Sequence, residues 1–265
     1  MKPLYGNKIL SSLSKKKPGI EITTKGSCSV RCTRYCPWEQ YQKSYGRPEE
    51  LLTKDTLRRI LGHIPSDAFV KFAGFCEPFD NPDCLSLIEY TIDQGFPVKL
   101  FTTLHGLKEK DVDRLVSLAF LDVCLHLPDC YGIVRHPGTP YYNDAVMKMV
   151  MHQKKVYFSV MNDLFRTNHR EDFCRGKPSK RWLFPRMCDK WVHPTFIVMP
   201  NGDAYFCCMD FRLQYRVGNL LEDSYDALVR QAQIPFDLCR SCQEGVSVWK
   251  GFRLLCTREK KKYVF

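Results

Sequence analysis

Three cysteines lie within nine residues of one another, at Cys28, Cys32 and Cys36 in the stretch CSVRCTRYCP. Thiols this close on a single loop cannot bridge one another without strain, so the spacing favours a metal ion or an iron–sulfur cluster over disulfides. Three thiolates leave one iron of a cluster without a protein ligand, and a small molecule can bind there. A zinc-binding loop or three reduced structural thiols are the alternatives, because zinc sites share such short spacings.

A second group of cysteines lies in the last third of the chain. One cysteine precedes a predicted hairpin with an Asn-Gly turn, two lie at its exit and a CxxC pair comes last: Cys188, Cys207, Cys208, Cys239 and Cys242. Four convergent thiols form a closed site for a 4Fe–4S cluster or a tetrathiolate zinc ion. Adjacent strand residues point to opposite faces, so we expect only one of Cys207 and Cys208 to bind.

The composition is that of a soluble globular protein. Of 265 residues, 44% are hydrophobic and 26% charged, which suits one large domain or a medium domain with a small one. No run of about 18 apolar residues occurs, so no membrane span or membrane partner is expected. The basic N-terminus lacks a continuous apolar segment and does not resemble a secretory signal. Fourteen cysteines without such a signal favour a reducing compartment, and we expect a cytoplasmic protein.

The formal net charge of +11 indicates an anionic partner, either nucleic acid, phosphate groups or an acidic peptide, or simply surplus surface lysine. Cations gather with aromatic residues in Asp163–Met187. Such a segment could clamp a phosphate and stack on a ring, or it could be a solvated linker between domains. We expect the domain boundary here.

Predicted strands and helices alternate through the first 160 residues. Apolar runs predict strands over Gly19–Thr24, Ala68–Phe75, Pro97–Leu104, Phe120–Leu127 and Val156–Met161. Helical spacing predicts helices over Thr53–Ile64, from Asn81 to Gly95, over Glu109–Leu118 and over Tyr142–Gln153. Further on, Thr195–Met199 and Ala204–Met209 form the hairpin, and Ser224–Gln231 a short helix. This order predicts an α/β fold with a parallel sheet, either open or curled into a barrel.

Several polar residues interrupt these otherwise buried strands and need a reason to be there. They are Glu21, Thr23, Lys71, Lys99, Thr102, Thr103, Cys124 and His126. We expect some of them at the C-terminal ends of the strands, where the sites of such folds collect, and others as hydrogen-bonded core residues.

The loop Cys28–Cys36 resembles the signature of the radical S-adenosylmethionine (SAM) superfamily, which is Cys, three residues, Cys, any residue, an aromatic, Cys. Tyr35 supplies the aromatic, but three residues separate Cys32 from Cys36 where the family has two. The resemblance implies a partial (β/α) barrel and a 4Fe–4S cluster on Cys28, Cys32 and Cys36 that binds SAM. It also implies reductive cleavage of SAM to a 5′-deoxyadenosyl radical, hydrogen abstraction from a substrate C–H bond and a reductant of the flavodoxin or ferredoxin type.

Other stretches resemble SAM-binding elements of the same superfamily. Gly74, Glu77 and Pro78 match its GGEP turn, with Cys76 in place of the second glycine. His126 lies where relatives have a serine that contacts SAM, and it implies a polar contact or a proton carrier. Ser159 and Asn162, at the end of the fifth predicted strand, match positions that meet the ribose.

The C-terminal cysteines resemble the SPASM/twitch extensions of radical SAM enzymes. Gly202 and Cys207 have the spacing of the family's hairpin motif, which favours Cys207 over Cys208. Too few cysteines follow for a full SPASM domain, so the shorter single-cluster twitch type is implied. Its second 4Fe–4S cluster would be held by Cys188, Cys207, Cys239 and Cys242, and would accept an electron from the substrate radical or serve as structure.

The expected organisation is an N-terminal extension (1–18), a radical SAM barrel (19–165), a basic linker (166–187) and an auxiliary cluster domain (188–265). The expected function is an oxidoreductase that acts on a phosphorylated or nucleotide-linked carbohydrate. A maturase for ribosomally made peptides is the alternative within the superfamily. A zinc-stabilised nucleic-acid-binding protein is the alternative from another class, since the charge and the CxxC pair permit it.

Overall fold

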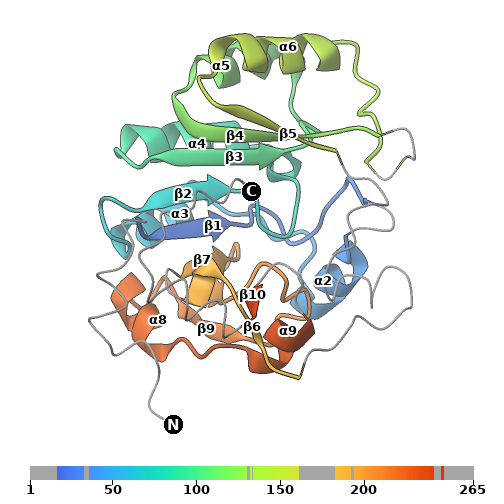
Figure 1. Ribbon diagram of the computed structural model, residues 1–265. Helices are drawn as coiled ribbons and strands as arrows, with labels where there is room; N and C mark the ends of the chain where they lie inside the picture. The colour runs from blue at the N-terminus through green and yellow to red at the C-terminus, as the bar shows by residue number, and fades with distance from the viewer. Residues whose placement is uncertain are drawn as a thin grey trace.

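An open sheet of eight strands organises the molecule, in the order β5-β4-β3-β2-β1-β7-β8-β9 (Figure 1). The strands are β1 (Gly19–Ile22), β2 (Phe69–Phe72), β3 (Val98–Thr102), β4 (Phe120–Leu127), β5 (Val156–Val160), β7 (Thr195–Val198), β8 (Asp203–Tyr205) and β9 (Arg216–Asn219). β1 to β5 and β7 run parallel, whereas β8 pairs antiparallel with both β7 and β9. This computed structural model describes residues 17–32, 36–129, 132, 134–160, 183–191, 194–241 and 246–247.

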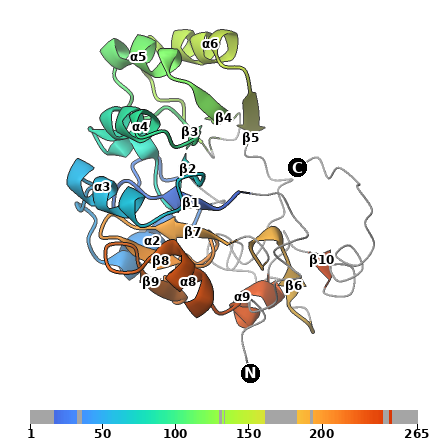
Figure 2. The same ribbon diagram turned by 90° about the vertical axis from the view of Figure 1, so that its left-hand side faces the viewer.

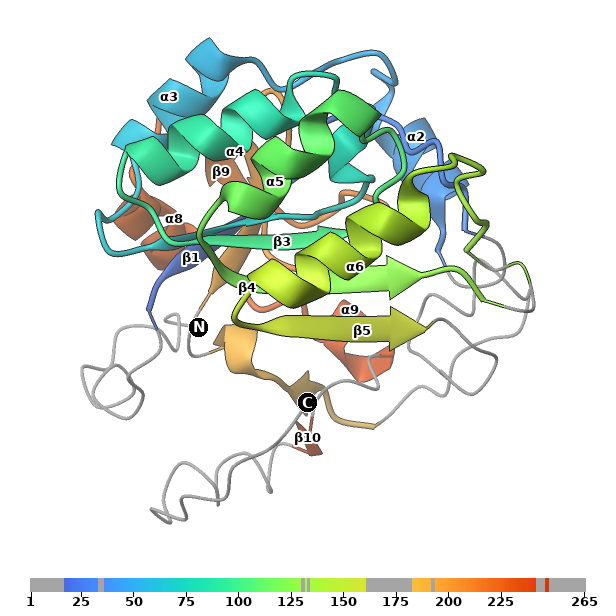
Figure 3. The same cartoon turned by 90° about the horizontal axis from the view of Figure 1, so that it is seen from above.

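Helices cover one face of this sheet and leave the other face to the site. Figure 3 shows four of them lying over the parallel strands, and Figure 2 shows them on one side of the sheet. They are α3 (Lys54–Gly62), α4 (Cys84–Asp93), α5 (Val112–Ser117) and α6 (Tyr142–His152). The remaining elements are α2 (Trp38–Tyr45), η2 (Pro78–Asp80), η3 (Glu109–Asp111), η4 (Asp189–Trp191), α8 (Tyr225–Gln231), α9 (Phe236–Ser241) and a small sheet of β6 (Arg186–Met187) and β10 (Val246–Ser247).

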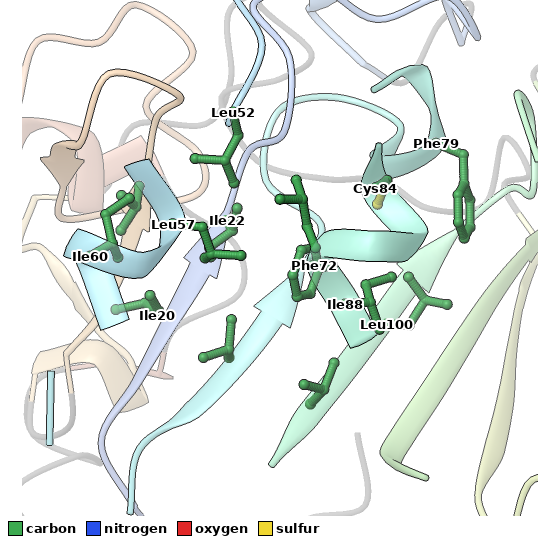
Figure 4. Packing of buried hydrophobic residues seen from close by; sticks show 14 of the residues in the cluster. Ile20, Ile22, Leu52, Leu57, Ile60, Phe72, Phe79, Cys84, Ile88 and Leu100 are labelled. Atoms are coloured by element: carbon green, nitrogen blue, oxygen red, sulfur yellow. The ribbon is translucent and has the colours of Figure 1, made fainter. Parts of the chain in front are cut away.

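The core forms between the sheet and these helices because strand side chains alternate between the two faces. Ile20, Ile22, Phe72 and Leu100 all point to the helical face and are fully buried. Figure 4 shows them packed against residues of α3 and α4, among them Ile88. Burial of one such side chain contributes about 1.5–3 kcal/mol, so this layer supplies most of the free energy that holds the sheet in place.

The predicted fold class is confirmed: the sheet is parallel, open and alternates with helices through β5. Predicted strand Phe120–Leu127 coincides with β4. Other predicted elements differ from the observed ones at their ends. The helix expected from Asn81 begins at Cys84, because η2 precedes it and the Asn81 side chain instead accepts a bond from the Asp83 N–H.

The hairpin differs from the prediction at its second strand. We expected Ala204–Met209, but β8 ends at Tyr205. The chain turns there, since the Asp210 N–H donates to the Cys207 carbonyl at 3.0 Å. The Asp210 carboxylate then accepts the N–H groups of Gln214 and Tyr215 and closes the loop.

One pairing joins the C-terminal third to the barrel. β7 lies parallel to β1, with Glu21 opposite Ile197 and Ile22 opposite Val198. β8 and β9 extend the same sheet beyond β7. The segment after Cys188 therefore adds strands to the same sheet that carries the first cysteine loop.

The described part of the chain contains no helix that has both the length and the apolar character of a membrane span.

Asn81 fixes the chain between β1 and α3, and its loss tests that link. Its buried amide donates to the carbonyls of Thr24 and Leu52. We expect Asn81→Ala to lower the free energy of unfolding by about 1–3 kcal/mol, because buried carbonyls lose their donor. Gln40→Ala is the control, since that amide donates only to Ser44 on α2. Anaerobic urea denaturation measures both, and equal effects would contradict the assigned role of Asn81.

Candidate functional site

The three cysteines of the first loop line one cavity of about 380 Å³ at the C-terminal ends of the parallel strands. Cys28, Cys32 and Cys36 all lie outside any disulfide bond. The loop is anchored at Ser29, whose N–H donates to an Asp80 carboxylate oxygen at 2.6 Å and whose hydroxyl donates to the other oxygen. Asp80 lies in η2, so the loop after β1 is tied to the turn after β2.

The donor set of this loop fits an iron–sulfur cluster. Burial and the nearby Cys36 raise the pKa of the Cys28 thiol, and the same causes raise the pKa of Cys32 to about 12. Thiols that resist ionisation, as Cys28 and Cys32 do, need a cation to hold them as thiolates. Metal binding supplies that charge, because cysteine ligands bind deprotonated.

The turn after β2 is shaped by Gly74. Its φ is +74°, and an added Cβ would lie 2.1 Å from the Thr23 hydroxyl oxygen, so only glycine fits without strain. Its N–H donates to Glu21 at 3.1 Å, and the next N–H, of Phe75, donates to Thr23 at 3.2 Å. β1 thus fixes the backbone of the turn, and the turn lines the cavity beside the cysteines.

Glu77 is buried at the floor of the same cavity and is fully engaged. One carboxylate oxygen accepts the Thr102 hydroxyl, and the other accepts the Thr103 N–H at 2.8 Å and the Thr103 hydroxyl at 2.7 Å. Burial raises the pKa of Glu77 to about 7 although these bonds favour the carboxylate. The group therefore joins the C-terminal end of β3 to the turn after β2. Pro78, the next residue, is buried and begins η2.

The inner face of the sheet is polar, as the interrupted strand patterns predicted. Four charges form a row across β1 to β4: Glu21, Lys71, Lys99 and Asp122 are successive cross-strand neighbours. Lys71 forms an ion pair with Glu21, and Lys99 with Asp122 at 2.8 Å. The two opposed lysines would repel each other, so the two carboxylates are required to hold them.

Beyond that row, the cavity wall is made by the strand ends. Cys124 and His126 of β4 and Ser159 of β5 line it, with His126 directly opposite Ser159 in the register. Phe101 of β3 lies under the Lys71 ammonium, 4.8 Å from the ring centroid. The structure thus brings the predicted contacts Gly74, Glu77, His126 and Ser159 together with the cysteine loop.

The C-terminal cysteines divide between two environments. Cys188, Cys207 and Cys239 pack in the same hydrophobic cluster, whereas Cys208 packs elsewhere and lines the cavity of the first loop. The described residues therefore separate Cys207 from Cys208 by the cluster in which each side chain packs. Burial lowers the pKa of Lys190, but the negative charges of Cys208, Glu21 and Cys207 outweigh it and raise that pKa above its ordinary value.

Three predicted site residues, Tyr35, Asn162 and Cys242, lie outside the described residues, as does most of the basic segment 166–187. Two contributors were missed from the sequence. Asp80 carries no local signal, because its partner Ser29 is 51 residues away. The sequence marked Thr103 only as a polar residue in a predicted strand. Its role comes from its position after β3, where its N–H and hydroxyl donate to the buried carboxylate of Glu77.

Known proteins resemble the chain both in a family model and in structure. Residues 188–243 match the SPASM family, an iron–sulfur cluster-binding domain. The structure of BtrN in complex with AdoMet and 2-DOIA has a TM-score of 0.61 at 17% identity, over 95% of this chain and 100% of BtrN. Native anSMEcpe with bound AdoMet and Cp18Cys peptide gives 0.52 at 14%, over 91% and 96%. Streptococcus suis SuiB bound to precursor peptide SuiA gives 0.50 at 11%, over 89% and 74%. No curated protein sequence gives a significant match.

The fold is therefore the one seen in radical SAM enzymes such as BtrN, and residues 188–243 match the SPASM family of iron–sulfur cluster-binding domains. The recognition made from the cysteine spacings, a radical SAM protein with a SPASM/twitch-like extension, is confirmed. The predicted cofactors, 4Fe–4S clusters and SAM, are those of that superfamily.

Replacing Gly74 tests the close approach of the turn to β1. We expect Gly74→Ala to cost well over the ~1 kcal/mol that positive φ alone costs an alanine, because its Cβ would overlap Thr23. Gly46→Ala is a matched control, since Gly46 has φ +70° but open space around its Cβ position. Anaerobic denaturation of both variants measures the difference. Equal losses of stability would show that the turn shifts freely, contrary to this geometry.

Proposed function

We propose that this protein is a radical SAM oxidoreductase that acts on a C–H bond of a small polar substrate held in the cavity of the first cysteine loop. The observation that carries the proposal is that three cysteines outside any disulfide, the glycine-shaped turn and the polar strand ends line one cavity. In such a protein the cofactor carries the difficult chemistry, and the chain supplies position and exclusion of water.

Cys28, Cys32 and Cys36 would hold the first cluster, which, once reduced by one electron, supplies the cleavage of SAM to methionine and a 5′-deoxyadenosyl radical. The residues of this chain bind and orient. The backbone of the turn at Gly74 is rigid and faces the cavity, so it suits the methionine end of SAM. Glu77 braces that turn against β3 and holds a proton near neutral pH.

His126 and Ser159 lie side by side on the wall formed by β4 and β5. Their position suits the ribose end of SAM or the substrate, since both side chains can donate and accept hydrogen bonds. His126 is also the cavity residue whose ordinary pKa suits proton transfer at neutral pH. We assign it a proton-carrying role beside its binding role.

The charges on the cavity wall support a substrate class. Lys71 and Glu21 place both signs of charge on its wall, which suits a polar or anionic molecule better than an apolar one. BtrN, which this chain covers from end to end, was crystallised with 2-DOIA, and this favours a small molecule. A phosphorylated or nucleotide-linked carbohydrate is the class we propose.

A peptide substrate is the second candidate. Two relatives of the same fold were crystallised with peptides, anSMEcpe with Cp18Cys and SuiB with SuiA. The molecules bound in these structures of one fold differ, so the substrate of this protein has to be identified by measurement.

The second cluster would be held by Cys188, Cys207, Cys239 and Cys242 and would accept the electron of the substrate radical. Lys190 supports this role, because its positive charge lies close to Cys207 and Cys188 and favours the arrival of an electron there. A two-electron oxidation of the substrate is the result.

Loss of any first-loop thiol is expected to abolish SAM cleavage. Anaerobically reconstituted protein with dithionite should release 5′-deoxyadenosine, and Cys28→Ala, Cys32→Ala and Cys36→Ala should reduce this by ~10³-fold or more, since no binding site for the cluster remains. Cys84→Ala, at a buried cysteine of the core, should retain it. Transfer of deuterium from labelled sugars or peptides into 5′-deoxyadenosine identifies the substrate class. Wild-type protein that holds its cluster and never releases 5′-deoxyadenosine would end the proposal.

Removing the second cluster separates electron acceptance from SAM cleavage. In Cys239→Ala/Cys242→Ala we expect iron to fall from about eight to about four atoms per chain, with SAM cleavage retained and oxidised product lost. Iron and sulfide analysis, 5′-deoxyadenosine yield and product yield are the measurements. Continued product formation by folded protein with four irons would leave the second cluster a structural role only.

A further inference from the structure

A second cavity lies on the outer side of the first cysteine loop. It measures about 990 Å³, and Cys32 and Cys36 line it as they line the inner cavity. The loop therefore has two faces. The inner face meets the turn at Gly74 and the strand ends, and the outer face meets α2 and the segment around Arg135.

The outer cavity is basic. Arg31, Lys43 and Arg135 are exposed on its wall, with His105 and His136 beside them. Its lining contains a single carboxylate, that of Glu39. Within the described part of the chain, no carboxylate forms an ion pair with any of the three cations.

One of the three cations, Arg31, is held in place by a neighbouring ring. Arg31 has a positive φ of 48° and its guanidinium lies 5.0 Å from the centroid of the Trp38 ring. This stacking is a cation–π contact that fixes the charge beside Cys32. His105 is joined to the inner site, since its ring nitrogen is 2.9 Å from the Thr103 hydroxyl, which in turn donates to Glu77.

We propose that this outer basic surface docks a small acidic protein that carries one electron, of the ferredoxin or flavodoxin type. The inference rests on the proposed function, which requires one electron to reach the first cluster for each SAM cleaved. The inner cavity is too small for a protein and is taken by cofactor and substrate. Cys32 and Cys36 line the outer cavity, so a protein docked there would be close to the first cluster, and the electron would have a short path to it.

The charge of the surface selects the partner. Complementary charges accelerate encounter and orient two proteins without much buried area, as suits a transient electron carrier. A single-stranded nucleic acid would instead need aromatic faces open for stacking. Trp38, the aromatic residue of this wall, is covered on one face by Arg31.

The transfer balances as a one-electron exchange. A reduced 2Fe–2S ferredoxin loses one electron and is oxidised; the first cluster gains that electron and is reduced. No proton or bond is exchanged between the two proteins.

Charge reversal on the outer wall tests the surface. The variant is Lys43→Glu/Arg135→Glu, which leaves the residues of the inner cavity intact. The control is Lys154→Glu/Lys155→Glu, an equal charge change on exposed residues before β5, at the opposite end of the parallel strands. Isothermal titration calorimetry of holoenzyme with an oxidised acidic 2Fe–2S ferredoxin gives Kd, and turnover with the reduced ferredoxin gives its KM.

We expect Kd and KM to rise on the order of tenfold or more in the outer-wall variant and to change little in the control. Binding of the wild type should weaken as salt rises, since exposed charges are screened. Equal effects in the two variants, or a Kd independent of salt, would overturn the proposal. So would a short single-stranded RNA that binds wild type more tightly than ferredoxin does and displaces it.

The dithionite reaction separates this inference from the proposed function. With dithionite as donor, 5′-deoxyadenosine release should be the same in wild type and both variants. If the wild type releases none, the proposed function fails, while the ferredoxin Kd still reports on the surface.

Discussion

A row of four charges on the inner face of the sheet is the constraint on which the rest of the structure depends. Glu21, Lys71, Lys99 and Asp122 lie on consecutive strands, and each lysine is held by the carboxylate on its outer side. Such pairs contribute little net stability, because desolvation offsets their attraction. The free energy that closes the fold therefore comes from the opposite face, where the apolar partners of the same strands meet the helices (Figure 4).

This division leaves a polar cavity on the inner face of the sheet, at the C-terminal ends of the parallel strands. The loops above it are held by bonds between segments far apart in the sequence: Asp80 holds the cysteine loop, and Glu77 holds the end of β3. A ligand that contacts all of these loops therefore binds to a preorganised site. Less ordering is then needed on binding, so more of the contact energy remains for positioning.

Local sequence patterns predicted most of the helices and strands. Buried runs gave β1 to β5, and helical spacing gave α3 to α6, because each element has its own period. α2 was missed, since Tyr41 is its one buried side chain and no apolar stripe marks it. The pairing of β7 with β1 was missed because it joins residues more than 170 positions apart and depends on no local signal. Likewise, cysteine spacing predicted the candidate ligands, but no short motif indicates the second cavity or the bond between Ser29 and Asp80.

The two-sided cysteine loop explains why such a site can be both closed and reducible. A substrate radical must be kept from solvent, yet the cluster has to receive electrons from a protein that cannot enter the cavity. These demands conflict if one opening serves both. Cys32 and Cys36 line two cavities, so a substrate in the inner cavity and an electron carrier at the outer one, with Arg31 and Arg135, would approach the cysteines from different sides. The bonds from Ser29 to Asp80 hold the start of this loop in place between them.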